Sequence, residues 1–476
     1  MGELKEKTLS GVKWNAIGRF STQGVSFVIS ILLARILTPS DYGVVGMIGI
    51  FIAIAQTFID SGFGSALIRK KDCTDEDFST AFYFNIAVGV ICYLILFFTA
   101  PLIASFFNTP ILIDIVRVLS INLFLNSLTI VQTAKLTIAM DFKSQAKVSL
   151  VATIVSGCVG LAMAYSGFGV WSLVYQSVSS SAVRTILFWM ITKWNPLRVF
   201  SKQSFNYLFS FGSKILSASL LHTIYANLTT ILIGRFYPPK DLGYYSRGEN
   251  LAKLPSSNLT GILQSVTYPI LSKIQDDDAR LIQVYRKYIR ITSLVIFFGM
   301  FLMVALSKPL ILTLLTDKWT DSIIYLQIFC FAYMFDHMCQ LNLNILYVKG
   351  RSDLVLKLEV IKKTISISMI VTAIPFGVLA ICISHALYTQ IAVIINTYYT
   401  GKLFGLGYLA QVKDFIKYFV CSFIAVLPGM ILSYTSLSPI LVMVVGVCVA
   451  GMMYWLMLRK DGNFVETLNI LTKHND

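Results

Sequence analysis

The chain has 476 residues, of which 56% are hydrophobic and only 13% are charged, and its mean hydropathy is +0.72. A soluble domain carries about 25% charged residues, so this composition excludes a soluble enzyme. Lys and Arg outnumber Asp and Glu by 39 to 24, which gives a net charge of +15 and raises the question of a nucleic-acid partner.

Apolar segments long enough to cross a bilayer follow one another along the whole chain. Their length and continuity predict an all-α polytopic membrane protein, because the strands of a membrane β-barrel would alternate in hydrophobicity over about 10 residues. We predict about fourteen transmembrane helices, at residues 14–37, 44–67, 80–104, 113–138, 148–165, 171–192, 211–234, 248–271, 291–306, 321–347, 359–375, 378–400, 417–435 and 439–458.

The basic residues are distributed very unequally between the two sides of these spans. Of the 39 Lys and Arg residues, 28 lie in the termini and in the loops on the same side, whereas four lie in the opposite loops. Basic loops face the cytoplasm, so we expect both termini to be cytoplasmic. Topology therefore accounts for the excess charge, and we expect no nucleic-acid partner.

One segment of the chain recurs 200 residues later. Residues 31–43 read ILLARILTPSDYG and residues 231–243 read ILIGRFYPPKDLG. Shared turn chemistry is one explanation, since Pro, Asp and Gly all favour tight turns. A parallel duplication is the other, and it predicts two six-helix lobes at 1–200 and 201–400, followed by an extra helix pair and a cytoplasmic tail within 401–476.

Span 1 carries a polar stripe that includes Arg19, Thr22 and Ser26, and Asn227 lies in a similar stripe in span 7. Helix packing explains such stripes in part. A charge within a span, however, needs water or a partner, which favours a hydrated cavity between the lobes. Asp60 lies at a depth similar to that of Arg19, so the two residues either form an ion pair or leave Arg19 available to a phosphate.

Span 8 holds Arg247, Glu249, Lys253 and Pro255 in its outer half. Either the proline interrupts a helix that lines a substrate path, or the span begins later than residue 248. No nucleotide-binding motif and no metal-ligand spacing occurs in the loops. We therefore expect no cofactor, no metal and no enzymatic activity.

Six segments together resemble the polysaccharide-exporter branch of the multidrug/oligosaccharidyl-lipid/polysaccharide (MOP) superfamily, the Wzx-type flippases. They are GVKWNAIGRFSTQGVSFVISILLARILTPSDYGVVGM (11–47), FIDSGFGSALIRKKD (58–72), GFGVWSLV (167–174), WNPLRVF (194–200), YPILSKIQDD (268–277) and KPLILTLLTDKW (308–319). The resemblance implies a V-shaped pair of helical lobes in the bacterial inner membrane. It also implies that the protein flips an undecaprenyl-diphosphate-linked oligosaccharide, a precursor of O-antigen, capsule or exopolysaccharide, to the periplasmic leaflet by alternating access.

The resemblance further implies a cavity whose cations neutralise the lipid diphosphate. Arg19 is the position most similar to such a cation, and Arg247 and Lys253 are companions by location alone. A cation-coupled multidrug or small-solute antiporter of the same superfamily is the alternative, although span 1 lacks the usual ion-coupling acid, a role that Asp60 or Glu249 could take. A membrane-embedded sugar polymerase or transferase is a third hypothesis, which the short outer loops disfavour. The expected partners are the lipid-linked oligosaccharide, the bilayer and polysaccharide polymerase machinery.

Overall fold

A computed structural model describes residues 2–60 and 62–472 of the chain. Its regular elements in these residues are all helices, which confirms the predicted all-α class. Residue 61, within the segment 58–72, and the last four residues of the predicted tail lie outside the described residues. The chain divides into two compact units, unit 1 at residues 1–243 and unit 2 at residues 244–476. These units group residues by packing, whereas the predicted lobes are copies of a repeat, so the lobe boundaries at 200 and 400 stay a prediction.

Unit 1 contains ten helices within its described residues and the first turn of an eleventh. They are α1 (Gly2–Ile36), α2 (Pro39–Asp60), α3 (Phe63–Arg69), α4 (Asp75–Phe106), α5 (Leu112–Leu119), α6 (Ile121–Ser127), α7 (Ile130–Ile138), α8 (Phe142–Tyr165), α9 (Trp171–Thr192), α10 (Lys202–Phe236) and the start of α11 (Pro239–Lys273).

Unit 2 contains the rest of α11, nine further α-helices and two short 3-10 helices within its described residues. They are α12 (Asp278–Ala305), α13 (Ser307–Leu314), η1 (Asp317–Trp319), α14 (Ser322–Tyr333), α15 (Asp336–Val348), α16 (Ser352–Ala373), η2 (Ile374–Phe376), α17 (Val378–Phe404), α18 (Tyr408–Leu432), α19 (Pro439–Leu458) and α20 (Gly462–Thr472).

Eleven helical stretches among the described residues are long and apolar enough to cross a membrane. Each coincides with one of the predicted spans. The other three predicted spans fall in α9, α11 and α16, which are helical but carry more polar residues. The structure thus supports eleven of the spans, and the count of fourteen stays a prediction.

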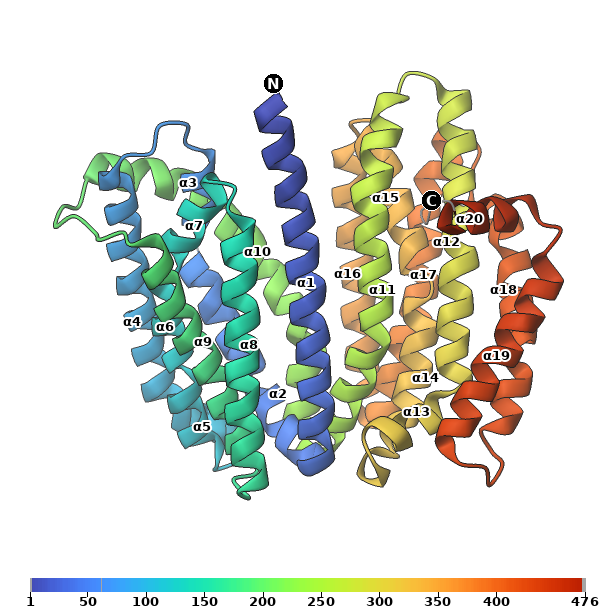
Figure 1. Ribbon diagram of the computed structural model, residues 1–476, viewed down its shortest axis with the longest axis horizontal. Coiled ribbons are helices and arrows are strands. Elements are labelled where there is room, and N and C mark those ends of the chain that lie inside the picture. Colours follow the sequence, from blue (N-terminus) through green and yellow to red (C-terminus); the bar gives the residue numbers. More distant parts are fainter. Residues whose placement is uncertain (1, 61, 473–476) are drawn as a thin grey trace. The chain divides into compact units, whose positions relative to one another are not determined.

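In unit 1, α1 packs along α8 (Figure 1). A Cβ atom on Gly18 would lie only 2.4 Å from the Cβ of Ala146, so the absence of a side chain lets the two helices approach closely. About three turns of α1 further on, Ile29 and Leu33 are buried in a cluster with Ala164 of α8. The side of α1 that faces α8 is therefore small and apolar.

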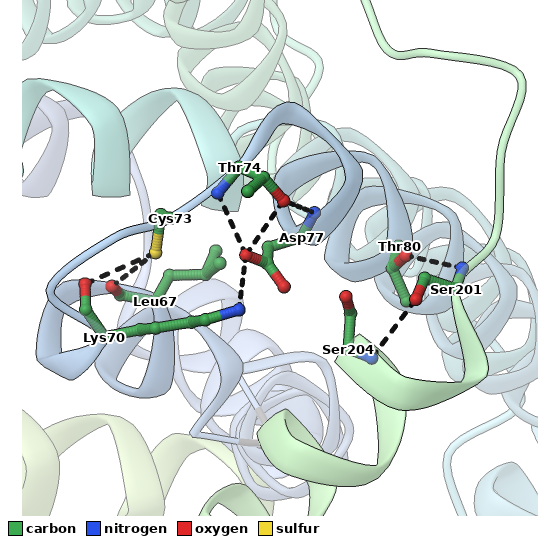
Figure 2. Close-up of polar contacts among 8 residues, drawn as sticks. All are labelled: Leu67, Lys70, Cys73, Thr74, Asp77, Thr80, Ser201 and Ser204. Carbon is green, nitrogen blue, oxygen red and sulfur yellow. Dashed lines mark hydrogen bonds and ion pairs between the residues drawn. The ribbon is translucent and has the colours of Figure 1, made fainter.

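The linker between α9 and α10 is fixed to the start of α4 (Figure 2). Thr74 and Asp77 form a reciprocal capping box there, and the buried Asp77 carboxylate also accepts a hydrogen bond of 2.6 Å from Lys70. The backbone N–H of Ser201 donates to the hydroxyl of Thr80 at 3.0 Å. This segment, which we predict to be cytoplasmic, is thus a folded part of unit 1.

In unit 2, α18 packs along both α12 and α19. The buried carboxylate of Asp414 in α18 accepts hydrogen bonds from Arg286 and Arg290 of α12, with distances between 2.6 and 2.9 Å. A buried carboxylate is stable only when its charge and lone pairs are satisfied, and two guanidinium groups achieve this. The predicted C-terminal helix pair is therefore joined to α12.

Candidate functional site

The polar stripe of α1 borders the side that packs on α8. Arg19 and Ser26 are exposed and are seven residues apart, which places them on nearly the same side of the helix. Between them, the buried Oγ1 of Thr22 has no hydrogen-bond partner among the described residues. The structure thus places Arg19 and Ser26 on the same exposed side of α1, whereas Thr22, four residues after Gly18, lies on the side that packs on α8.

Arg19 and Asp60 do not form an ion pair among the described residues. The Asp60 carboxylate instead accepts a hydrogen bond of 2.9 Å from Gln56, four residues earlier in α2. The side-chain oxygen of Gln56 in turn accepts one of 2.9 Å from Asn126 in α6. Gln56 was not predicted as the partner of Asp60, because Gln56 carries no charge. The signal was its position four residues before Asp60, since Gln and Asp at this spacing form a stabilising hydrogen bond in helices.

Asn227 forms a hydrogen bond within α10, next to a polar contact between α10 and α2. Its side-chain N–H donates to the carbonyl oxygen of Thr223 at 2.8 Å, and the hydroxyl of Thr223 lies 3.1 Å from that of Thr57. The contact between Thr223 and Thr57 joins α10 to α2 and fits the packing explanation for the stripe in span 7, whereas the bond of Asn227 stays within α10.

Arg247 lies inside unit 2 rather than on its surface. Its side chain is only 8% exposed, and its guanidinium group lies 5.6 Å from the centre of the Trp319 ring. Stacking of a desolvated guanidinium on an indole stabilises the packing of α11. This geometry points to a structural role for Arg247, while Lys253, six residues later, is exposed.

Glu249 and Lys253 belong to a polar cluster built from α11, α14, α15 and α17, which we call the α11 cluster. The phenol of Tyr333 donates a hydrogen bond of 2.8 Å to the Glu249 carboxylate. Lys253 lies close enough to Asp336 and His385 for its charge to act on both. The Nε2 atom of His385 is buried without a hydrogen-bond partner among the described residues. The cluster can hold a proton or neutralise an anion.

Glu249 and Lys253 were predicted from the sequence as candidate site residues, whereas Tyr333 and His385 were not. A histidine within a span was the available signal, because ionisable groups are rare there. The helix from Pro239 to Lys273 also continues through Pro255, so the expected interruption at that proline is absent, and a later start of the membrane span stays a prediction. No group of three or more metal-ligating side chains occurs in the part of the chain that the structure describes.

The loop between α3 and α4 contains a cysteine, Cys73, outside the membrane-spanning helices. Its thiol donates to the carbonyl oxygen of Leu67 at 3.1 Å (Figure 2). Burial, followed by the charge of Asp77, raises the pKa of the Cys73 thiol above its usual value. A thiol with a raised pKa is a poor nucleophile, which disfavours covalent catalysis at this position.

A family model described as "polysaccharide biosynthesis protein" matches residues 32–324, well over half of the chain. The chain belongs to this family. It is 26% identical over 357 residues to the teichuronic acid biosynthesis protein TuaB of Bacillus subtilis, covering 74% of each protein. It is 25% identical over 396 residues to the lipopolysaccharide biosynthesis protein WzxC of Escherichia coli, covering 83% of this chain and 80% of WzxC.

The fold is also that of a solved transporter. The structure of the lipid II flippase MurJ in an inward closed conformation matches with a TM-score of 0.74 and 14% identity, covering 94% of this chain and 99% of MurJ. This likeness confirms the exporter fold predicted for the present chain. The residues matched by the family model include Glu249 and Lys253 of the α11 cluster, whereas the polar stripe of α1 lies before the first matched residue.

Proposed function

We propose that this protein carries a polyprenyl-diphosphate-linked oligosaccharide from the cytoplasmic to the periplasmic leaflet of the bacterial inner membrane by alternating access. Membership in the polysaccharide biosynthesis family supports the substrate class, and the fold supports a transport role rather than bond chemistry. Polysaccharide polymerase machinery would take over the product in the periplasm. Both termini would then face the cytoplasm, as the positions of the basic residues indicate.

The observation that carries this proposal is that Arg19 is an exposed charge within a membrane-spanning stretch. It lies six residues, or about 9 Å, inside a helix long and apolar enough to span the membrane. A charge at the centre of a bilayer costs at least about 3 kcal/mol, so it must meet water or a counter-charge. Arg19 is exposed and has no ion pair with any described residue. A diphosphate is a suitable counter-charge, because guanidinium binds phosphate oxygens in pairs and stays protonated.

Lys253 would be a second cation for the diphosphate, and Thr22 and Ser26 would line the same polar path. Glu249 or Asp60 would couple transport to an ion. The bond from Tyr333 to Glu249 favours Glu249, because protonation would remove the negative charge of the acceptor and so weaken a bond that holds α11 to α14. This same bond is the observation that favours the second candidate function, a cation-coupled multidrug or small-solute antiporter.

Deletion of the gene tests the proposal. We expect a lipid-linked oligosaccharide to accumulate on the cytoplasmic leaflet and surface polysaccharide to disappear, with both effects reversed by the wild-type gene. Arg19→Lys should restore export in part, because a point charge remains, whereas Arg19→Ala should restore little. Lys13→Ala, which removes a cation at the start of the same helix, is the matched control and should restore export. An altered drug resistance without any lipid-linked intermediate would favour the antiporter instead.

A further inference from the structure

A cavity of about 460 Å³ lies between the C-terminal parts of α11 and α15 in unit 2. This volume falls within the range of about 300–1,000 Å³ for pockets that bind small molecules. We call it the α11/α15 pocket, and the residues that line it are Gly261, Gln264, Tyr268, Pro269, Asn344 and Tyr347.

The lining of the α11/α15 pocket is aromatic and polar but uncharged. Tyr268 and Tyr347 are 43% and 44% exposed, so their rings are available to a ligand. Asn344 is only 2% exposed, yet its side-chain NH₂ group has no hydrogen-bond partner among the described residues. An unsatisfied buried donor is unfavourable by about 1–3 kcal/mol, so a ligand acceptor that reached the Asn344 amide from the pocket would be stabilised by it.

We propose that the α11/α15 pocket binds a neutral sugar residue of the oligosaccharide. A pyranose ring has an apolar C–H face, which packs on an aromatic ring, and a rim of hydroxyl groups, which pair with the donors and acceptors of amides. Two tyrosines and the amides of Gln264 and Asn344 supply both. A diphosphate would instead require cations, and none of the six lining residues is charged. A polyprenyl chain would leave the polar groups of the lining unsatisfied.

The position of the pocket fits a sugar far from the lipid. Tyr268 follows Lys253 by fifteen residues, or about 22 Å along α11. If Lys253 holds the diphosphate, the pocket lies well along the glycan. Just beyond the pocket, Lys349 donates to the carbonyl oxygen of Gln275 and pairs with Asp278, both at 2.5 Å. These contacts join the end of α11 to that of α15 and hold the two walls together.

This inference rests on the proposed function, so its test uses two lipids that differ only in the glycan. The full-length protein in nanodiscs is titrated with the lipid-linked oligosaccharide extracted from cells that lack the gene, and with sugar-free undecaprenyl diphosphate. We expect the double variant Tyr268→Ala/Tyr347→Ala to bind the glycan-bearing lipid about tenfold more weakly and the sugar-free lipid unchanged. The corresponding Phe variants keep the rings and should bind both lipids within about twofold of the wild type.

A second variant removes no existing contact. A Cβ on Gly261 would meet nothing within 4 Å, so Gly261→Leu fills the pocket while the helix stays intact, and it should likewise weaken binding of the glycan-bearing lipid alone. Tyr165→Ala, at a tyrosine that is 77% exposed in unit 1, is the control and should change neither affinity.

Three other outcomes have distinct meanings. Unchanged binding of both lipids by the double variant and by Gly261→Leu would refute the sugar site. An equal loss for both lipids would also refute it, because the pocket would then recognise the diphosphate or the lipid chain. If the wild-type protein binds neither lipid more tightly than an ordinary phospholipid, the proposed function itself is wrong, and the sugar site is refuted with it.

Discussion

Replacing Gly43 or Gly243 by alanine should force apart the two turns that the sequence repeat relates, residues 39–43 and 239–243. These turns contact each other within unit 1. A Cβ on Gly43 would lie 1.7 Å from the carbonyl oxygen of Pro239, and a Cβ on Gly243 would lie 1.9 Å from that of Pro39. The two contacts are equivalent at the offset of 200, as an approximate two-fold axis requires. Only glycine permits such an approach of one backbone to another.

The size of the effect follows from these distances. Cβ atoms essentially never approach other atoms closer than 3.0 Å, so the backbones must separate by at least about 1.3 Å in Gly43→Ala and about 1.1 Å in Gly243→Ala. The obstructing atom is a backbone oxygen, which cannot rotate away. Overpacking of this kind destabilises by about 1–3 kcal/mol. Because the strain vanishes once the turns part, each variant should favour the parted state by about 5- to 150-fold.

Disulfide cross-linking between cysteines at Thr38 and Pro238 measures whether the turns are together. In the otherwise wild-type protein we expect a cross-link in the inward-open state that arrests export, and reduction should restore export. Adding Gly43→Ala should lower the cross-linking yield at least about fivefold. Gly49→Ala in the same helix is the control, because a Cβ there meets nothing within 4 Å.

Two results would refute this reasoning. If Gly43→Ala and Gly49→Ala give the same cross-linking yield at equal protein levels, the contact between the two turns has room for a side chain at position 43, contrary to the distances. Complete cross-linking with undiminished export would show that the turns need not part during transport, which would contradict motion of the lobes about this point.

Three further predictions concern topology, charge and pH. A cysteine at exposed Arg280 should escape labelling by a membrane-impermeant reagent in cells with a permeable outer membrane, and efficient labelling would overturn the cytoplasmic orientation. Arg19→Ala/Asp60→Ala should export as poorly as Arg19→Ala, because Asp60 bonds to Gln56, and recovery of export would show that the two charges serve only each other. Burial disfavours the charged form of Asp461, but hydrogen bonds from Lys417 and from the first turn of α20 outweigh this effect and lower the pKa of its carboxyl group. The ionised carboxylate therefore stabilises the folded protein above the unfolded pKa near 4, and this stabilisation is lost as pH falls below that value. The protection of α20 amides against hydrogen exchange, taken relative to the unfolded rate at the same pH, should therefore fall below about pH 4, and Asp461→Ala should lower this protection at neutral pH as well.

The sequence by itself determined the class of fold. Only helices and closed barrels satisfy backbone hydrogen bonds in lipid, and continuous apolar segments select helices. Hydropathy alone therefore located each of the eleven helical stretches that are long and apolar enough to span a membrane within the described residues. The repeat at 31–43 and 231–243 was likewise visible in the residues, since turn chemistry is local. The six motifs were sufficient to recognise the exporter family.

The tertiary structure decided which side chains meet. Arg247 and Lys253 look alike in the sequence, yet one is buried against Trp319 and the other is exposed. Asp60 bonds to Gln56 rather than to Arg19. The α11/α15 pocket joins residues about 80 positions apart, and neither helix shows it alone. Such pairings depend on how each helix is rotated and how closely it approaches its neighbours, and these are set by packing over the whole unit rather than by local sequence.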